Sequence, residues 1–158
     1  MSKLVTIEGV RETLIQRLRD YLPEAEAIGI LGSLARGKFD QKESDIDVFV
    51  VLNEIVAETH NIWWKRVREA LSDYDRDVTV LVYSIKGLKS VSNWYVLRLA
   101  AEGVTFYDRG GVGNLFAKIV EAAHRAGLVE GETEEGRKTW TVGKPLEWGG
   151  VIEVVVEN

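Results

Sequence analysis

Residues 28–52 read IGILGSLARGKFDQKESDIDVFVVL, and the order of residue types in this stretch indicates the fold. An apolar run at 28–31 stops at Gly32-Ser33, a polar turn with several basic residues covers 34–44, and Asp45-Ile46-Asp47 leads into a second apolar run at 48–52. Short apolar runs bounded by glycine and polar residues are typical of buried strands. We therefore predict a strand, a Gly-Ser turn and a second strand that opens on two acids.

Asp45 and Asp47 predict a site for a divalent cation. Successive side chains of a strand point to opposite faces, so these two carboxylates project from the same face. Two carboxylates near a buried core repel each other unless a cation lies between them. Mg²⁺ suits such a pair because it keeps bound waters and takes substrate phosphates as further ligands. A structural ion pair or a cap at the start of the strand is the alternative interpretation.

Gly32 and Ser33 predict a phosphate-binding turn beside that cation. Glycine lets a phosphate approach the backbone closely, serine supplies a hydroxyl, and a helix that starts there would direct free N–H groups at an anion. Arg36 and Lys38 lie where they could reach a triphosphate. The alternative for each is a solvated or ion-paired surface charge.

The combination of Gly32-Ser33 with Asp45-x-Asp47 resembles the signature of the nucleotidyltransferase superfamily typified by DNA polymerase beta. In that signature a short turn separates Gly-Ser from Asp-x-Asp, and residues 34–44 form the corresponding turn. The sequence GSLARG…SDIDVFVV is most similar to the minimal nucleotidyltransferase (MNT) branch of that superfamily. The resemblance covers roughly residues 10–108.

This resemblance implies a metal-dependent transfer of NMP, with AMP from ATP as the expected case, to a hydroxyl acceptor with release of pyrophosphate. It implies Mg²⁺, or Mn²⁺ in its place, and a third carboxylate on a strand beside the Asp-x-Asp strand. Asp77 is the first choice because it directly precedes the apolar run at 78–82, Asp75 is the fallback, and a solvated acidic turn is the third interpretation. The predicted catalytic and metal-binding residues are Asp45, Asp47 and Asp77, and the predicted phosphate-binding residues are Gly32, Ser33, Arg36 and Lys38.

The acceptor is expected to be a small molecule or a partner protein, because 158 residues leave little room for further domains that would hold a nucleic acid. Minimal nucleotidyltransferases of prokaryotes often accompany a helical HEPN partner, so the resemblance also implies a HEPN-type protein partner. The alternative function is a non-catalytic nucleotide-binding or antitoxin-like protein-binding module of the same fold.

The composition of the chain bears on its partners and on the compartment in which it works. The net charge of −5 argues against a surface that coats nucleic acid. The absence of cysteine excludes disulfides and fits a reducing compartment. The N-terminal residues lack a signal-peptide core, and no run approaches the ~20 apolar residues that span a bilayer. We expect a cytoplasmic protein without membrane contact.

The fold class predicted from these segments is α/β (α+β), with a small mixed central sheet flanked by helices. Apolar periodicity predicts helices at 7–22, 62–71 and 91–102, strands at 78–82 and 104–107, and a loop at 86–90. Residues 1–110 are the expected nucleotidyltransferase domain.

Residues 111–158 are the expected C-terminal extension, packed on the same domain or used for assembly, including a homo-oligomer. A helix is predicted from about 115 to 126, and a hairpin is predicted from strands at 138–142 and 151–156. Trp140 and Trp148 are expected to be packing residues rather than a base-stacking pair.

Overall fold

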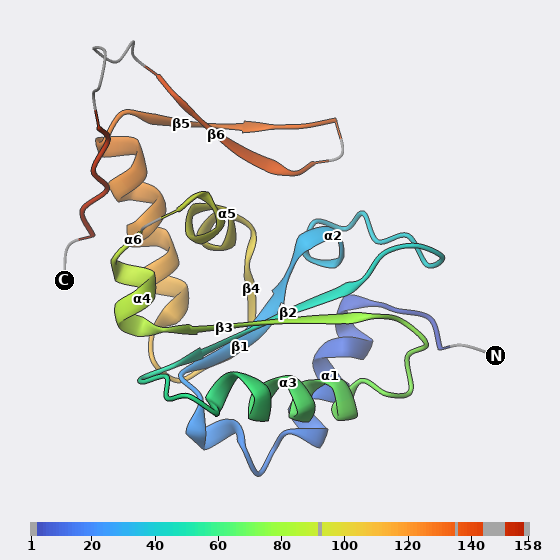
Figure 1. Ribbon diagram of the computed structural model, residues 1–158. Coiled ribbons are helices and arrows are strands. Elements are labelled where there is room, and N and C mark those ends of the chain that lie inside the picture. Colours follow the sequence, from blue (N-terminus) through green and yellow to red (C-terminus); the bar gives the residue numbers. More distant parts are fainter. Residues whose placement is uncertain (1–2, 92, 135, 144–150, 157–158) are drawn as a thin grey trace.

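The computed structural model describes residues 3–91, 93–134, 136–143 and 151–156 of the chain. In these residues a four-stranded sheet has helices on both faces, and a separate two-stranded hairpin lies over one helical layer (Figure 1). The predicted class, a mixed sheet flanked by helices, is confirmed. The elements are α1 (Ile7–Arg17), η1 (Leu22–Glu24), β1 (Ala27–Leu31), α2 (Gly32–Ala35), β2 (Ile46–Leu52), α3 (Thr59–Ala70), β3 (Val78–Ser84), α4 (Ile85–Lys89), α5 (Trp94–Glu102), β4 (Val104–Asp108), α6 (Val112–Arg125), β5 (Leu128–Glu132) and β6 (Lys138–Val142).

The sheet has the order β3-β2-β1-β4, with β2 and β3 parallel and the other two pairs antiparallel. Strand β2 is therefore paired along both of its edges. In this register Asp47 lies opposite Leu31 of β1 and opposite Thr79 of β3. The acid-bearing start of β2 is thus placed beside the end of β1, where Gly32-Ser33 begins.

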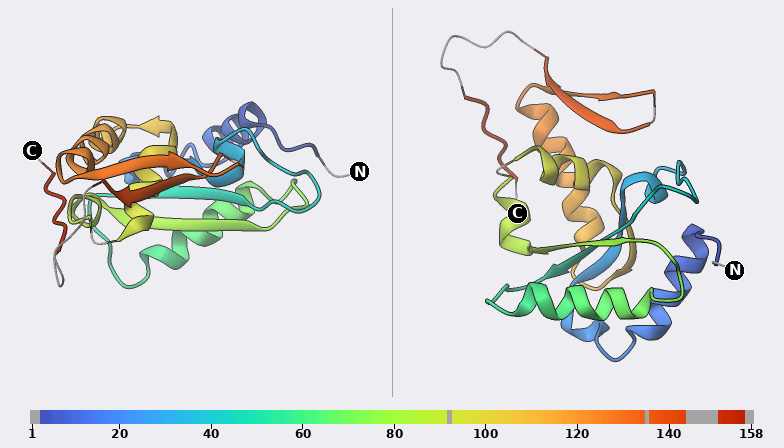
Figure 2. Two further views of the ribbon diagram at one scale, coloured as in Figure 1. Left: turned by 90° about the horizontal axis from the view of Figure 1, so that it is seen from above. Right: turned by 45° about the vertical axis from the view of Figure 1, so that its right-hand side comes forward.

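Alternate residues of β2 are buried in two separate cores. Val48 and Val50 pack in the core beneath α1 and α3, whereas Phe49 packs in the core formed with α5 and α6. The Phe49 and Phe116 rings meet edge to face, with centroids 5.5 Å apart. Figure 2 shows these two layers from further directions. Asp47 has the parity of Phe49 and so projects from the α5–α6 face.

Several helix ends differ from the sequence prediction. Helix α1 ends at Arg17 rather than at residue 22, and Pro23 lies in the separate short helix η1. The segment at 85–89 is a helix rather than a loop, because the Ser84 side chain accepts a hydrogen bond from the Gly87 N–H (2.9 Å) and caps it.

Helix α5 begins at Trp94 rather than at residue 91, because the Asn93 side chain accepts the N–H of Val96 and caps the helix there. Trp94 and Tyr95, in the first turn of this helix, are 55% and 67% exposed. Among the described residues no helix has the length and apolarity needed to cross a bilayer.

The predicted C-terminal helix is confirmed as α6, but the hairpin uses different strands. Strand β6 pairs with β5 in an antiparallel register, not with residues 151–156. Gly127, with φ +93°, turns the chain from α6 directly into β5, so a nearer strand is available to β6. Residues 151–156 form no strand; Ile152 and its apolar neighbours pack against the α5–α6 core. Trp140 is buried in that core as expected, and Trp148 lies outside the described residues.

Candidate functional site

Gly32 lies at the junction of β1 and α2 in a conformation that favours glycine. Its φ is +74°, in the left-handed region that a side chain rarely adopts. A Cβ added at this position would overlap Oδ2 of Asp47. The lack of a side chain at Gly32 therefore allows the Asp47 carboxylate to lie directly against the backbone at the start of α2.

The surroundings of Asp47 disfavour ionisation of its carboxyl group. Burial raises the pKa of Asp47 above its ordinary value of 3.8, and the neighbouring carboxylate of Asp45 raises it further. A hydrogen bond with Thr79 and the guanidinium groups of Arg98 and Arg36 act in the opposite direction. The net effect is a half-buried carboxylate that a bound cation would stabilise in its ionised form.

Asp45 and Asp77 lie at the same end of the parallel strands β2 and β3. The N–H of Ile46 donates to the Asp77 carbonyl (2.9 Å), which joins the two chains just before the strands begin. Both aspartates are exposed and line one cavity of about 640 Å³. Asp75 lines the same cavity. The structure therefore places the backbone of Asp77 beside that of Asp45, and the choice between Asp77 and Asp75 as third acid stays a prediction.

Arg76 fixes the loop that leads to Asp45. Its Nε and Nη2 both donate to the Ser44 carbonyl (2.8 and 2.5 Å), and its Nη1 donates to the Lys42 carbonyl (2.6 Å). A planar guanidinium can make several such bonds at once. Arg76, which precedes Asp77, therefore holds Ser44, which precedes Asp45.

A second cavity, of about 470 Å³, lies on the α2 side of the acids. Ser33, Arg36 and Lys38, three of the predicted phosphate-binding residues, line it together with Ser44 and two acids, Asp40 and Glu43. Arg36 is also ion-paired: its Nη1 lies 3.4 Å from an oxygen of Glu102, and the two side chains are only 11% and 1% exposed. Arg36 is therefore a largely buried, ion-paired side chain rather than a solvated surface charge, and its contact with a phosphate stays a prediction.

Thr79, Arg98 and Glu102 also lie at the site, although no motif in the sequence indicates them. Arg98 and Glu102 form an i,i+4 pair on α5, with Nε 3.6 Å from the carboxylate oxygen. That spacing is visible in the sequence as charges inside an otherwise apolar helix. What the spacing did not indicate is that Glu102 would be buried and shared with Arg36 of α2.

The side chains at this site could supply Mg²⁺ with two carboxylate ligands. Among the described parts of the chain, no three or more His, Cys, Asp or Glu side chains are arranged to hold a metal ion. Asp45 and Asp47 supply carboxylate oxygens on one strand face, and the residue paired with Asp47 on β3 is Thr79 rather than a third acid. Mg²⁺ commonly uses one or two carboxylates together with waters and substrate phosphates. These residues therefore fit an ion that is shared with a bound polyphosphate.

Comparison with known families agrees with this geometry. The model of the nucleotidyltransferase domain family matches residues 11–99, which is more than half of the chain. The chain belongs to the nucleotidyltransferase domain family. The matched region of this nucleotidyltransferase includes Gly32, Ser33 and the aspartates at positions 45, 47, 75 and 77, and it ends before Glu102 and the C-terminal hairpin. The superfamily resemblance expected from the sequence is confirmed.

Solved structures show the same fold at low sequence identity. A toxin–antitoxin complex with AMP-PNP contains a chain that is 22% identical, with a TM-score of 0.53; the alignment covers 73% of this chain and 86% of that one. A chain from the tri-AMPylated Shewanella oneidensis HEPN toxin in complex with MNT antitoxin is 17% identical, with a TM-score of 0.50 and coverage of 76% and 87%. A mutant toxin–antitoxin MntA-HpeT gives 19% identity, a TM-score of 0.51 and coverage of 73% and 86%. No curated protein matches this chain.

Proposed function

We propose that this nucleotidyltransferase transfers AMP from ATP to a hydroxyl group on a protein partner. The observation that carries the proposal is the placement of Asp47 against the backbone of Gly32, with Asp45, just before β2, near enough to raise the pKa of Asp47. This arrangement sets the acids that suit a divalent cation beside the turn that suits a phosphate. A small-molecule hydroxyl is the other acceptor class.

In the proposed complex each group of residues has a separate task. Ser33, Arg36 and Lys38 bind the phosphates of ATP from the α2 side. Asp45 and Asp47 hold Mg²⁺, or Mn²⁺ in its place, which when bound neutralises phosphate charge. The acceptor oxygen attacks the α-phosphorus, the bond from that phosphorus to the pyrophosphate oxygen breaks, and pyrophosphate leaves.

The remaining task is to accept a proton. When the acceptor oxygen bonds to phosphorus, its hydroxyl proton must pass to a base. We assign this role to Asp77, which lines the cavity beside Asp45, and Asp75 is the fallback. Transfer by this route depends on positioning and charge rather than on a covalent enzyme intermediate.

The proposed partner is a HEPN-type helical protein. One of the structurally similar complexes contains AMP-PNP, and another contains a tri-AMPylated HEPN toxin with its MNT antitoxin. These properties belong to those proteins, and the shared fold supports a search for the same chemistry in this one. The acceptor would then be a hydroxyl-bearing side chain of the partner.

The deciding experiment is transfer of label from α-³²P-ATP to a co-expressed HEPN-type protein, with Mg²⁺ or Mn²⁺ present. Asp45→Asn and Asp47→Asn should each abolish labelling while the circular dichroism spectrum stays unchanged. Glu54→Gln, an exposed carboxylate after β2, is the matched control and should retain labelling. Full activity of either aspartate variant would exclude the assigned roles.

One observation favours a second candidate, a module that binds nucleotide or a protein partner without transferring AMP. The described residues contain no three-acid metal group, and Thr79 rather than an acid faces Asp47. This candidate predicts that Mg²⁺-ATP binds by isothermal titration calorimetry, or that a HEPN-type partner is bound, while no labelled product forms. A labelled partner would exclude it.

A further inference from the structure

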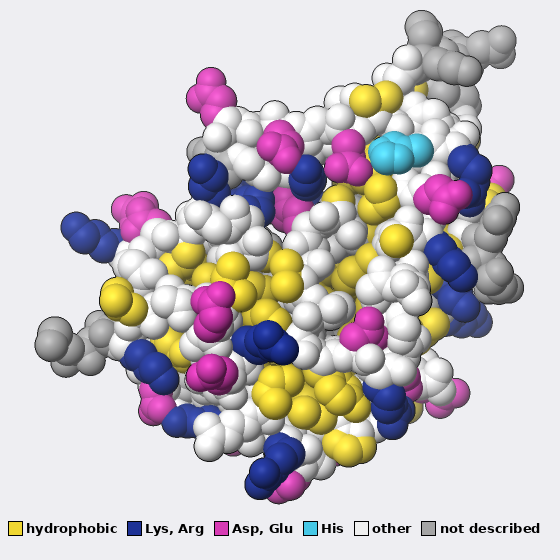
Figure 3. All heavy atoms as spheres, turned by 180° about the vertical axis from the view of Figure 1, so that it is seen from behind, with side chains coloured by type: hydrophobic (Ala, Val, Ile, Leu, Met, Phe, Trp, Pro, Cys, Tyr) yellow, Lys and Arg dark blue, Asp and Glu magenta, His cyan; other side chains and the backbone are white. Residues whose placement is uncertain are grey.

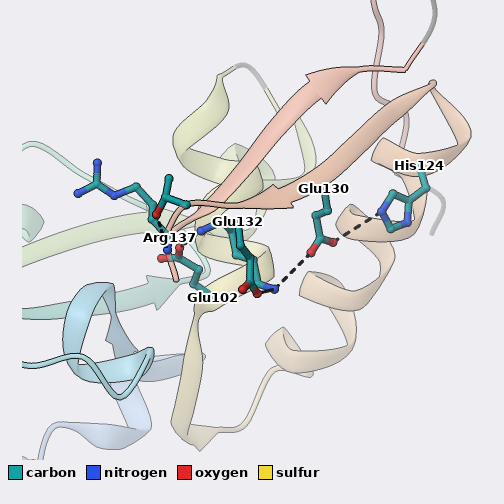
Figure 4. A network of polar contacts seen from close by, with 7 residues as sticks. Glu102, His124, Glu130, Glu132 and Arg137 are labelled. Atoms are coloured by element: carbon teal, nitrogen blue, oxygen red, sulfur yellow. Dashed lines mark hydrogen bonds and ion pairs between the residues drawn. The ribbon is translucent and has the colours of Figure 1, made fainter. Parts of the chain in front are cut away.

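The β5–β6 hairpin reaches the phosphate side of the site. Its core-facing residue Trp140 is buried against the α5–α6 layer, and its turn extends toward α2 (Figures 1 and 4). A Cβ added at Gly136, in that turn, would lie 3.9 Å from Cε of Lys38. Lys38 lines the cavity that also holds Ser33 and Arg36. A segment far along the chain thus lies beside Lys38, on the wall of the proposed nucleotide site.

Glu102 connects the hairpin to that wall. Its side chain is only 1% exposed, and Oε1 accepts the backbone N–H of Lys138 at 2.7 Å. Its other oxygen, Oε2, lies 3.4 Å from Nη1 of Arg36 and 3.6 Å from Nε of Arg98. One buried carboxylate therefore joins β6, α5 and the residue that follows α2.

Lys138 contacts different carboxylates through its backbone and through its side chain. Its backbone N–H is donated inward to Glu102, whereas its side-chain nitrogen bonds Glu132 and lies 3.8 Å from Glu130. Figure 4 shows these carboxylates continuing along the hairpin to His124. In Figure 3 basic and acidic side chains are interspersed along this side of the molecule. Glu132 can therefore be changed without touching the Glu102 contacts.

Glu102 is the negative partner of two arginines that lie near the proposed site. Arg36 and Arg98 both act electrostatically on Asp47, so both guanidinium groups lie near the proposed metal and phosphate positions. A buried charge without a partner is strongly unfavourable. Glu102 balances one of the two positive charges, and Asp47 lies close enough to both guanidinium groups to balance the other. A metal ion bound at Asp47 would offset that carboxylate and leave the arginines to a polyphosphate.

We propose that Glu102 is a positioning residue through which the β5–β6 hairpin holds Arg36 and Arg98 for the phosphates of a nucleotide. The proposal rests on the proposed function, since it assumes that a nucleoside triphosphate binds beside Gly32-Ser33. It assigns a role to a segment that lies beyond the matched family region, which ends at residue 99.

The test is calorimetric titration of the full chain with Mg²⁺-ATP. Glu102→Gln keeps an acceptor for the Lys138 N–H but removes the charge that holds the arginines, and we expect about tenfold weaker binding, equivalent to about 1.4 kcal/mol. Glu132→Gln removes a hairpin carboxylate of the same Lys138 and should bind within about twofold of the unmodified chain. Equal binding by the unmodified chain and Glu102→Gln would overturn the proposal.

A second measurement separates positioning from simple stability. Because coupling between two sites is reciprocal, Mg²⁺-ATP should slow amide hydrogen exchange at the start of β6 in the unmodified chain and not in Glu102→Gln. Should Glu102→Gln fail to fold, Lys138→Pro removes the N–H that Glu102 accepts together with the ion pairs of the lysine side chain, whereas Lys138→Ala removes those ion pairs alone. Only the proline variant should weaken binding. An unmodified chain that binds no Mg²⁺-ATP refutes the proposed function itself, whereas binding without any slowing in β6 refutes only the hairpin's role.

Discussion

The Asp47 carboxylate lies against the backbone of Gly32 so closely that a Cβ at residue 32 would overlap its Oδ2 atom. This contact joins the two halves of the family signature, the Gly-Ser turn and the Asp-x-Asp strand. It also makes the geometry of α2 depend on that of β2.

Gly32→Ala should be more damaging than Gly37→Ala. Both glycines have a positive φ, +74° and +73°, so each alanine incurs the left-handed penalty of about 1–2 kcal/mol. Only residue 32 adds the overlap with Asp47, since nothing lies within 4 Å of a Cβ at residue 37. Urea unfolding should show the larger loss of stability for Gly32→Ala, and calorimetry should show lost ATP binding. Similar losses in the two variants would mean that the carboxylate moves aside freely.

Asp47→Asn should stabilise the folded protein at neutral pH while it abolishes transfer. Because the folded pKa of Asp47 is raised above 3.8, the folded state holds its proton more tightly than the unfolded state. The contribution of Asp47 to stability is therefore present below pH 3.8 and is lost as pH rises through the raised folded pKa. The asparagine variant has no such loss.

The predicted gain in stability can be checked by urea unfolding of Asp47→Asn and of the unmodified chain between pH 4 and 8. The advantage of Asp47→Asn should grow with pH and should shrink when excess Mg²⁺ is added, since the cation stabilises only the ionised carboxylate. A variant that is less stable than the unmodified chain throughout this range would show that the carboxylate is favourably paired.

Arg76→Lys should loosen the loop before Asp45. A lysine cannot reproduce the three hydrogen bonds that the guanidinium makes to the carbonyls of Ser44 and Lys42. Faster amide exchange at 42–46 and a higher half-saturating Mg²⁺ concentration in the labelling assay are expected. Arg19→Lys, an exposed arginine after α1, is the control and should change neither quantity.

Phe116→Ala should destabilise the whole chain in a single transition, by about 3–5 kcal/mol. The Phe116 ring lies edge to face with Phe49 of the central strand, so α6 shares the core of the sheet. Lys118→Ala, an exposed position on the same helix, should be nearly neutral. Two separate unfolding transitions would instead support a boundary near residue 110, which is still only a prediction.

The sequence by itself determined the parts of this protein that depend on local pattern. The apolar runs on either side of Gly32-Ser33 and Asp45-x-Asp47 predict two strands, the turn between them and the family, because the period of a strand places both acids on one face. The amphipathic spacing of α6 is a local signal of the same kind. The hairpin prediction was half right: β6 is a strand, but its partner is β5, since chain reversal at Gly127 offers a nearer strand.

Only the tertiary structure decided which charges meet. Nothing in the spacing of Arg36, Arg98 and Glu102 indicates that the arginines share one buried carboxylate, or that Glu102 also binds the backbone of Lys138. The same is true of Arg76, whose guanidinium reaches carbonyls more than thirty positions earlier in the chain. Local periodicity fixes the face on which a side chain lies, whereas its partners depend on how the elements pack, and that packing results from the burial of the whole core.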